Sequence, residues 1–232
     1  MKSSIKFITM LFLVLLLSGC SKEEREANRL YRSLMEDISE IDALENDASI
    51  SDKLAVYSQA RYKLERIRTR YAATKKGKEI LENPTFSSGQ SAEDILSEAL
   101  SLEDRASEEL SENQIKLIII SAISTPEIRN HRLESHGVSL ARQGNIEEAK
   151  AILPDLLNSL SKAIVQLEIA KAYYQEDDIE AAKSISLEAH DKISQYNLNE
   201  NICSTVSCDN EEARKRLVET ELRRFRIELY SS

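Results

Sequence analysis

Residues 144–150 read Gly-Asn-Ile-Glu-Glu-Ala-Lys, and residues 177–183, which lie 33 positions later, read Asp-Asp-Ile-Glu-Ala-Ala-Lys. Each copy lies between two stretches whose apolar residues follow the three-and-four spacing of an α-helix. A period near 33 residues is typical of stacked units that each consist of a helix, a turn and a second helix. We therefore predict two helical hairpins within residues 125–195.

The two copies resemble the tetratricopeptide repeat (TPR). The residues that carry the resemblance are large or small where the repeat requires it: Leu133, Gly137, Leu140 and Ala149 in the first copy, and Ala170, Tyr173, Tyr174, Ala182 and Ala189 in the second. Three positions depart from the pattern, because Gln166 and His136 replace large apolar residues and Pro154 interrupts a second helix. The resemblance implies an all-α fold in which the hairpins form a right-handed superhelix, or solenoid.

The rest of the chain is also predicted to be helical, since it contains only five glycines and three prolines. Apolar stripes predict helices around Leu30–Leu44 and Leu54–Tyr71, with a short helix at Lys75–Leu81. Ser91 is expected to cap a further helix, and the β-branched run Leu117–Ile120 is read as a buried helix. Asp209 and Glu212 have capping-box spacing before a last helix whose apolar face should cover the final hairpin: Val218, Leu222, Phe225 and Leu229.

The N-terminal residues resemble a bacterial lipoprotein signal. Lys2 and Lys6 precede an apolar run from Phe7, which is followed by Leu17-Ser18-Gly19-Cys20. The run has about 11 apolar positions, too few to cross a bilayer as a helix. The resemblance implies cleavage before Cys20 and acylation of this residue, and Ser21 favours the periplasmic face of the outer membrane of a Gram-negative bacterium. Several acyl chains make a durable membrane anchor.

The two other cysteines, Cys203 and Cys208, would then face an oxidising compartment, where a disulfide is the default pairing and two free thiols are the alternative. The predicted organisation has four parts: a signal peptide (1–19), an N-terminal helical region (20–124), TPR-like repeats (125–195), and a disulfide loop with a capping helix (196–232).

Charge limits the classes of partner. The chain has 31 basic and 40 acidic residues, and cleavage before Cys20 would leave 29 basic residues and a net charge of −11, which argues against nucleic acid as a partner. One segment is basic all the same: Arg61, Lys63, Arg66, Arg68, Arg70, Lys75, Lys76 and Lys78. It could bind anionic lipid head groups, cell-wall carboxylates or an acidic partner helix, or it could pair with the acidic segment Glu93–Glu112.

Catalytic signatures are not found in the sequence. No Gly-x-Ser-x-Gly elbow, phosphate-binding glycine loop or His-Glu-x-x-His motif occurs. His131 and His136 flank Glu134, but five helical residues separate the imidazoles by about 140°, which does not suit a shared metal ion. We expect no enzymatic activity, cofactor, metal or small-molecule substrate, and a hydrolase is the least favoured reading.

Binding is the expected function, with an envelope protein or peptide as partner. In TPR-like stacks the first helix of each hairpin lines the surface that holds partner peptides, which makes Tyr173 and Tyr174 candidates, with Arg142 and Gln175 nearby. Adjacent helical positions diverge by about 100°, so burying one tyrosine should expose the other. Packing of both tyrosines in the core is the alternative.

Overall fold

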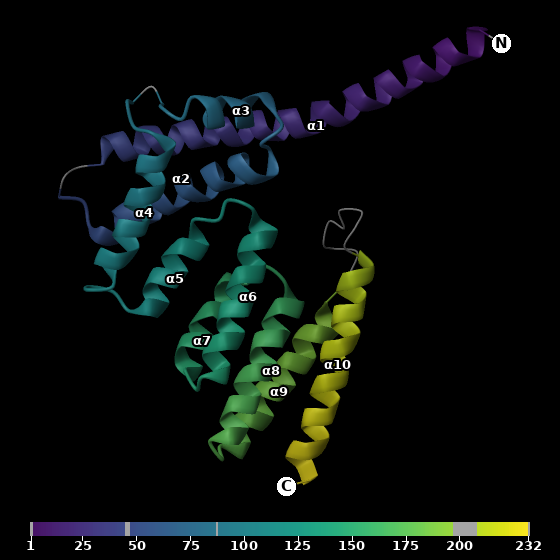
Figure 1. The fold of residues 1–232 in the computed structure, drawn as a ribbon. Coiled ribbons are helices and arrows are strands. Elements are labelled where there is room, and N and C mark those ends of the chain that lie inside the picture. Colours follow the sequence, from purple (N-terminus) through teal and green to yellow (C-terminus); the bar gives the residue numbers. More distant parts are fainter. Residues whose placement is uncertain (1, 45–46, 87, 197–207, 232) are drawn as a thin grey trace. The chain divides into compact units, whose positions relative to one another are not determined.

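The computed structural model describes the backbone of residues 2–44, 47–86, 88–196 and 208–231. Side chains are described for residues 22–44, 47–86, 88–196 and 210–231. The described part is all-α and contains no strand beyond an isolated bridge between Thr85 and Ser91. It divides into two compact units, residues 1–124 and 125–232 (Figure 1).

The first unit contains five helices: α1 (Lys2–Ala43), α2 (Ile50–Arg70), α3 (Lys75–Glu82), α4 (Ala92–Ala106) and α5 (Glu112–Ser121). Helix α2 is central, because it packs against each of the other four. In the hydrophobic core of this unit, the predicted apolar stripe of α1 packs with side chains of α2 and α4, among them Leu34, Ile67 and Ile95. The helices predicted around Leu30–Leu44, at Leu54–Tyr71, at Lys75–Leu81 and after Ser91 are confirmed as α1 to α4. Ser91 caps α4 as expected, and it does so in a capping box with Asp94.

Helix α1 runs without a break from Lys2 to Ala43, so it begins earlier than the helix predicted around Leu30–Leu44. One expectation for this unit was wrong. Helix α5 contains the run Leu117–Ile120 but has no fully buried residue. Its β-branched side chains are half-buried beside α2 and the end of α4.

The second unit contains α6 (Pro126–Arg142), α7 (Ile146–Ile152), a 3₁₀ turn (Leu153–Asp155), α8 (Ser159–Gln175), α9 (Ile179–Gln195) and α10 (Cys208–Ser231). Pro126 occupies the first turn of α6, where its missing N–H costs nothing, although the Thr125 hydroxyl makes no cap hydrogen bond to the helix. Pro154 ends α7 after two turns, as the sequence suggested.

The two copies of the quoted sequence form the same turn. Gly144 has φ +80° and Asp177 has φ +61°, so each places a left-handed residue after its helix. The next N–H then donates to a carbonyl five residues back, from Asn145 to Leu140 (2.9 Å) and from Asp178 to Tyr173 (2.9 Å). The predicted 33-residue offset is therefore an offset between two equivalent helix–turn–helix hairpins.

Small residues let the helices of this unit approach closely. A Cβ atom on Gly137 of α6 would lie 3.1 Å from both methyl groups of Val165 on α8. Ala170, Ala182 and Ala189 are completely buried where α8 meets α9. Helix α10 packs on α8 and α9 through its predicted apolar face, which is buried in the same core.

Candidate partner-binding groove

A groove runs along the second unit between α6, α8 and α10. It consists of two hollows of about 440 and 390 Å³ that share Glu221 of α10. The larger hollow has apolar side chains, among them Ile164 and Leu217, and a set of charged groups: Glu134, Arg142, Glu168, Arg214 and Glu221. The smaller hollow continues between α8 and α10 past Tyr174 and Gln175. We call these two hollows the inner groove.

Glu168 is the central charged residue of the inner groove. Its side chain is buried, and it accepts hydrogen bonds from Arg142 Nε (2.7 Å) and Lys171 Nζ (2.6 Å). Burial opposes ionisation of Glu168, but the two cationic donors outweigh this effect and hold the pKa of its carboxyl below the ordinary value. Lys171 also lies 3.6 Å from Glu221. The network therefore connects the first helices of both hairpins to α10.

Glu134 and Arg214 form a second link across the groove. Glu134 is buried on α6, and Arg214 of α10 donates a hydrogen bond to its Oε1 atom. Its other oxygen, Oε2, is buried and has no hydrogen-bond partner among the described residues. A buried acceptor without a donor is energetically costly, so the hydrogen bond from Arg214 compensates only part of the burial of Glu134.

Three of the four predicted binding residues line the inner groove. Arg142 borders the larger hollow, and Tyr174 and Gln175 border the smaller one. Tyr173 lies elsewhere: its hydroxyl accepts a hydrogen bond from Lys150 of α7, whose Nζ lies 4.9 Å from the ring centroid. The structure thus brings Arg142, Tyr174 and Gln175 together and separates Tyr173 from them.

The expectation that one tyrosine would be buried and the other exposed was wrong. Both rings are half-buried against the core of the unit. Tyr174 packs edge-to-face on Phe225 of α10, with ring centroids 5.8 Å apart and an interplanar angle of 87°. Helix α10 supplies this second wall, which the spacing within α8 could not reveal.

Sequence reasoning did not single out Glu168, Arg214 or Glu221 as site residues, and considered Glu134 only as a metal ligand. A signal existed for Glu168, because it is an acidic residue within the long apolar stretch of α8, where an unpaired charge would be costly. Arg214 and Glu221 carried no such signal, since α10 is rich in charges on every exposed face.

The basic segment pairs largely within its own unit. Arg61 binds Glu103 (2.6 Å) and Arg68 binds Glu93 (3.1 Å), which connects α2 to the acidic helix α4. Lys63 forms a buried ion pair with Asp37 of α1 at 2.6 Å. The remaining members are engaged less or differently: Lys76 pairs with Glu79, Arg66 donates to the Tyr62 hydroxyl, Arg70 lies over the Tyr71 ring, and Lys75 and Lys78 are exposed.

Other predicted sites carry little structural detail. The side chain of Cys20, the expected lipidation site, lies outside the described part of the chain. The expected disulfide also lies outside it, because neither Cys203 nor the side chain of Cys208 is described. The same holds for the side chain of Asp209, the expected cap residue of the last helix. No cluster of three potential metal ligands occurs among the side chains that the structure describes. Within the described helices, none combines the length and apolar character needed to cross a membrane.

No family model, curated protein or solved structure matches this chain. What is shown is an all-α chain whose second unit contains two equivalent helical hairpins and a groove between α6, α8 and α10.

Proposed function

We propose that this chain is a lipid-anchored scaffold of the cell envelope that binds another polypeptide in the inner groove. The observation that carries the proposal is the groove itself: the first helices of two hairpins and α10 form a hollow with apolar walls and fixed charged groups. Such a hollow suits an extended peptide, whose apolar side chains would contact walls that include Ile164 and Leu217. The mechanism would be binding and not chemistry.

The finer description of the fold belongs to the same proposal. We propose that the two hairpins are TPR-like and begin a right-handed solenoid that α10 caps. The equivalent turns at Gly144 and Asp177, together with close approach at Gly137, support this description. The anchor at Cys20, a periplasmic location on the outer membrane and the Cys203–Cys208 disulfide remain predictions from sequence.

Binding of a cell wall or anionic membrane surface by the basic segment is the alternative proposal. It has less support, because Arg61, Lys63 and Arg68 already pair with carboxylates of the same unit. A hydrolase has less support still, since no observation in the described residues favours it.

Site-specific photo-crosslinking in cells tests the groove. A photoreactive residue at Leu217, which is 59% exposed at the groove, should capture one defined envelope protein. The matched control is the same residue at Leu100 of α4, which is 51% exposed in the first unit. Glu168→Lys should abolish the product formed from Leu217. Equal products from both positions, or a product unaffected by Glu168→Lys, would contradict the proposal.

Membrane fractionation tests the anchor independently. Cys20→Ala should move the protein out of the outer-membrane fraction while crosslinking from Leu217 to a soluble partner persists. If Cys20→Ala fractionates like the wild type, the prediction of a lipid anchor at Cys20 is wrong. The proposal that the inner groove binds a polypeptide is then tested by the crosslinking result alone.

A further inference from the structure

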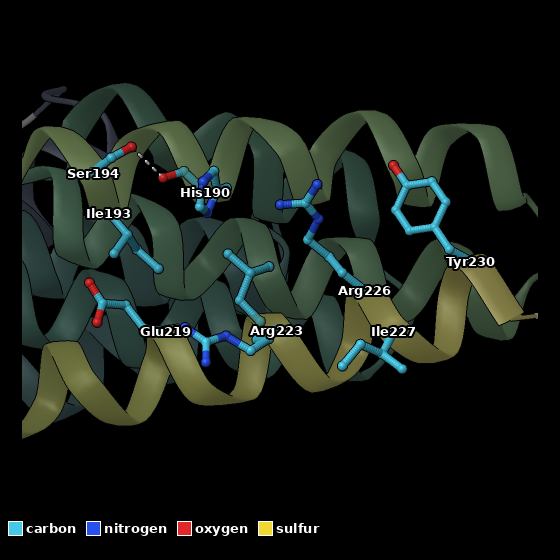
Figure 2. A pocket seen from close by; sticks show the side chains of 9 residues that line it. His190, Ile193, Ser194, Glu219, Arg223, Arg226, Ile227 and Tyr230 are labelled. Carbon is cyan, nitrogen blue, oxygen red and sulfur yellow. Dashed lines mark hydrogen bonds between the residues drawn. The ribbon is translucent and has the colours of Figure 1, made fainter.

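A second hollow lies on the other side of α10, between α10 and α9. Its volume is about 530 Å³, and Figure 2 shows Arg226 and Tyr230 extending from α10 toward α9. Helix α10 contributes Glu219, Arg223, Arg226 and Tyr230, whose spacing of four, three and four residues places them on one face. This face is adjacent to the buried apolar face but separate from the residues that line the inner groove. We call this hollow the outer groove.

Charge distinguishes the outer groove from the inner one. In the inner groove Arg142, Arg214 and Lys171 each pair with a carboxylate. In the outer groove, Arg223 and Arg226 form no ion pair within the described part of the chain, and Figure 2 shows His190 of α9 across from them. Glu219 is the one carboxylate among the lining residues, and it already lies 3.9 Å from Lys215. The side chains that line the outer groove therefore carry a net positive charge, although the protein as a whole is acidic.

Apolar side chains of the outer groove are exposed as well. Ile193 and Leu222 form its buried floor. Ile227 and Tyr230 at its rim are 63% and 57% exposed, whereas large apolar side chains such as isoleucine are usually buried. Lys183 Nζ of α9 lies 5.6 Å from the Tyr230 ring centroid, and Arg226 Cζ lies 6.0 Å from it, so this exposed ring lies beside two cations.

From these observations we infer that the outer groove binds an amphipathic acidic helix of a partner protein. A groove between two packed helices has the shape that accepts the ridge of a third helix. The apolar face of that helix would cover the exposed Ile227 and Tyr230, and its carboxylates would pair with Arg223 and Arg226. Charge complementarity selects an acidic helix over a basic one. This binding surface is distinct from the inner groove and does not depend on the function proposed for it.

A designed peptide provides the probe. It is a helical peptide of about five turns with leucines at i, i+3 and i+7 spacing and glutamates on both flanks of this stripe. We expect it to bind the full chain in a zwitterionic detergent, measured by fluorescence anisotropy, with backbone amide NMR shifts confined to α9 and α10. The same peptide with lysine in place of glutamate, and a scrambled peptide of the original composition, should bind at least about tenfold more weakly.

Charge-reversed variants decide the outcome. Arg223→Glu/Arg226→Glu should weaken binding of the acidic peptide about tenfold or more, whereas the control Arg32→Glu/Arg132→Glu, at two exposed positions that line neither groove, changes the net charge equally and should leave the affinity unchanged. Circular dichroism verifies that both variants remain folded. Equal affinity of the two variants would overturn the inference, as would NMR shifts in the inner groove. Displacement of the peptide by vesicles of anionic phospholipid, or dimerisation of the chain through Arg223 and Arg226, would replace the acidic helix by another occupant and also overturn it.

Discussion

The two hairpins of the second unit have equivalent turns but unequal second helices. Helix α9 has 17 residues, whereas α7 has seven and ends at a 3₁₀ turn that contains Pro154. The residue of α9 that corresponds to Pro154 is Leu187, 33 positions later, and α9 continues through it. Proline in a helix interior removes a backbone hydrogen bond and clashes with the preceding turn. Pro154 thus prevents α7 from continuing as α9 does, and the N-cap of α8 at Asn158 limits its length as well.

The hairpins also differ at their turns and at their packing positions. Gly144 and Asp177 occupy the same left-handed conformation, which glycine adopts without a steric penalty and aspartate adopts at some cost. Gly137 of α6 corresponds to Ala170 of α8, and both face neighbouring helices. The comparison teaches that the repeat is preserved where the backbone requires it, at the turn and at close contacts, and varies in the length of the second helix.

Transfer of the proline to the second hairpin gives the largest expected effect. Leu187→Pro should destabilise the second unit by about 3 kcal/mol or more, because it breaks α9 in its interior. Urea unfolding followed by circular dichroism measures the loss. Leu187→Ala is the control, and since Leu187 is 44% exposed, this change should cost far less. A small effect of Leu187→Pro would mean that α9, like α7, does not need its full length.

The close contact at Gly137 gives the next largest effect. Gly137→Leu should destabilise the protein by about 3 kcal/mol, because its Cβ atom would already lie 3.1 Å from the methyl groups of Val165 and the longer side chain would force α6 away from α8. The control Ser139→Leu, at an exposed position of the same helix, should change the unfolding free energy by no more than about 0.5 kcal/mol. If the two variants unfold at the same urea concentration, the α6–α8 contact is not close-packed.

The buried carboxylate of the second hairpin provides a pH test. Glu168 lies on α8, whereas the equivalent residue of α6 is the exposed Ser135. Glu168→Gln should cost about 1 to 2 kcal/mol at neutral pH, since it removes an ionised acceptor from Arg142 and Lys171. Because the pKa of Glu168 is lowered on folding, its stabilisation is complete above the ordinary glutamate pKa of 4.5 and is lost as the pH falls through the lower, folded value.

The measurement is the difference in unfolding free energy between the wild type and Glu168→Gln over this acidic range. The difference should shrink as the pH falls. Asp37 of the first unit supplies a contrast, because burial raises the pKa of its carboxyl despite the hydrogen bond from Lys63. The ionisation of Asp37 therefore costs stability as the pH rises from the ordinary aspartate pKa of 3.8 to the higher, folded value, which is the opposite sign. A difference for Glu168→Gln that is constant with pH would show that Glu168 is not ionised in the folded protein.

Local features of both units were predictable from sequence, and long-range ones were not. The turns at Gly144 and Asp177, the capping box at Ser91 and the apolar face of α10 depend on residues within a few positions of one another. The wall that α10 adds to the inner groove depends on contacts such as Glu134 with Arg214, which are 80 residues apart. No periodicity within one helix encodes such a pair. Pairing of Lys63 with Asp37 was hidden for the same reason.

The basic segment illustrates a different limit. Its charge was evident in the sequence, and so was the acidic segment that follows it. Composition alone left open whether the two pair internally or whether the basic one binds an outside ligand. The alignment of α2 with α4 decides part of this question, since it places Arg61 beside Glu103 and Arg68 beside Glu93. The half-buried state of Leu117–Ile120 was likewise a matter of which helices cover α5 and not of its own residues.

Exchange of the two turn residues gives the smallest and most specific effect. Asp177→Gly should stabilise the second hairpin by about 0.5 to 1 kcal/mol, because glycine adopts a φ of +61° without the steric cost that aspartate bears. Gly144→Asp should destabilise the first hairpin by a similar amount, about 1 kcal/mol. Hydrogen exchange of the α6–α7 and α8–α9 amides measures each effect locally. If the two hairpins are equivalent repeats, the changes are opposite in sign and the double variant is close to the wild type. If Asp177→Gly and Gly144→Asp both destabilise their hairpins, the two turns are not equivalent. The Asp177 side chain would then stabilise its own turn beyond what the shared backbone conformation explains.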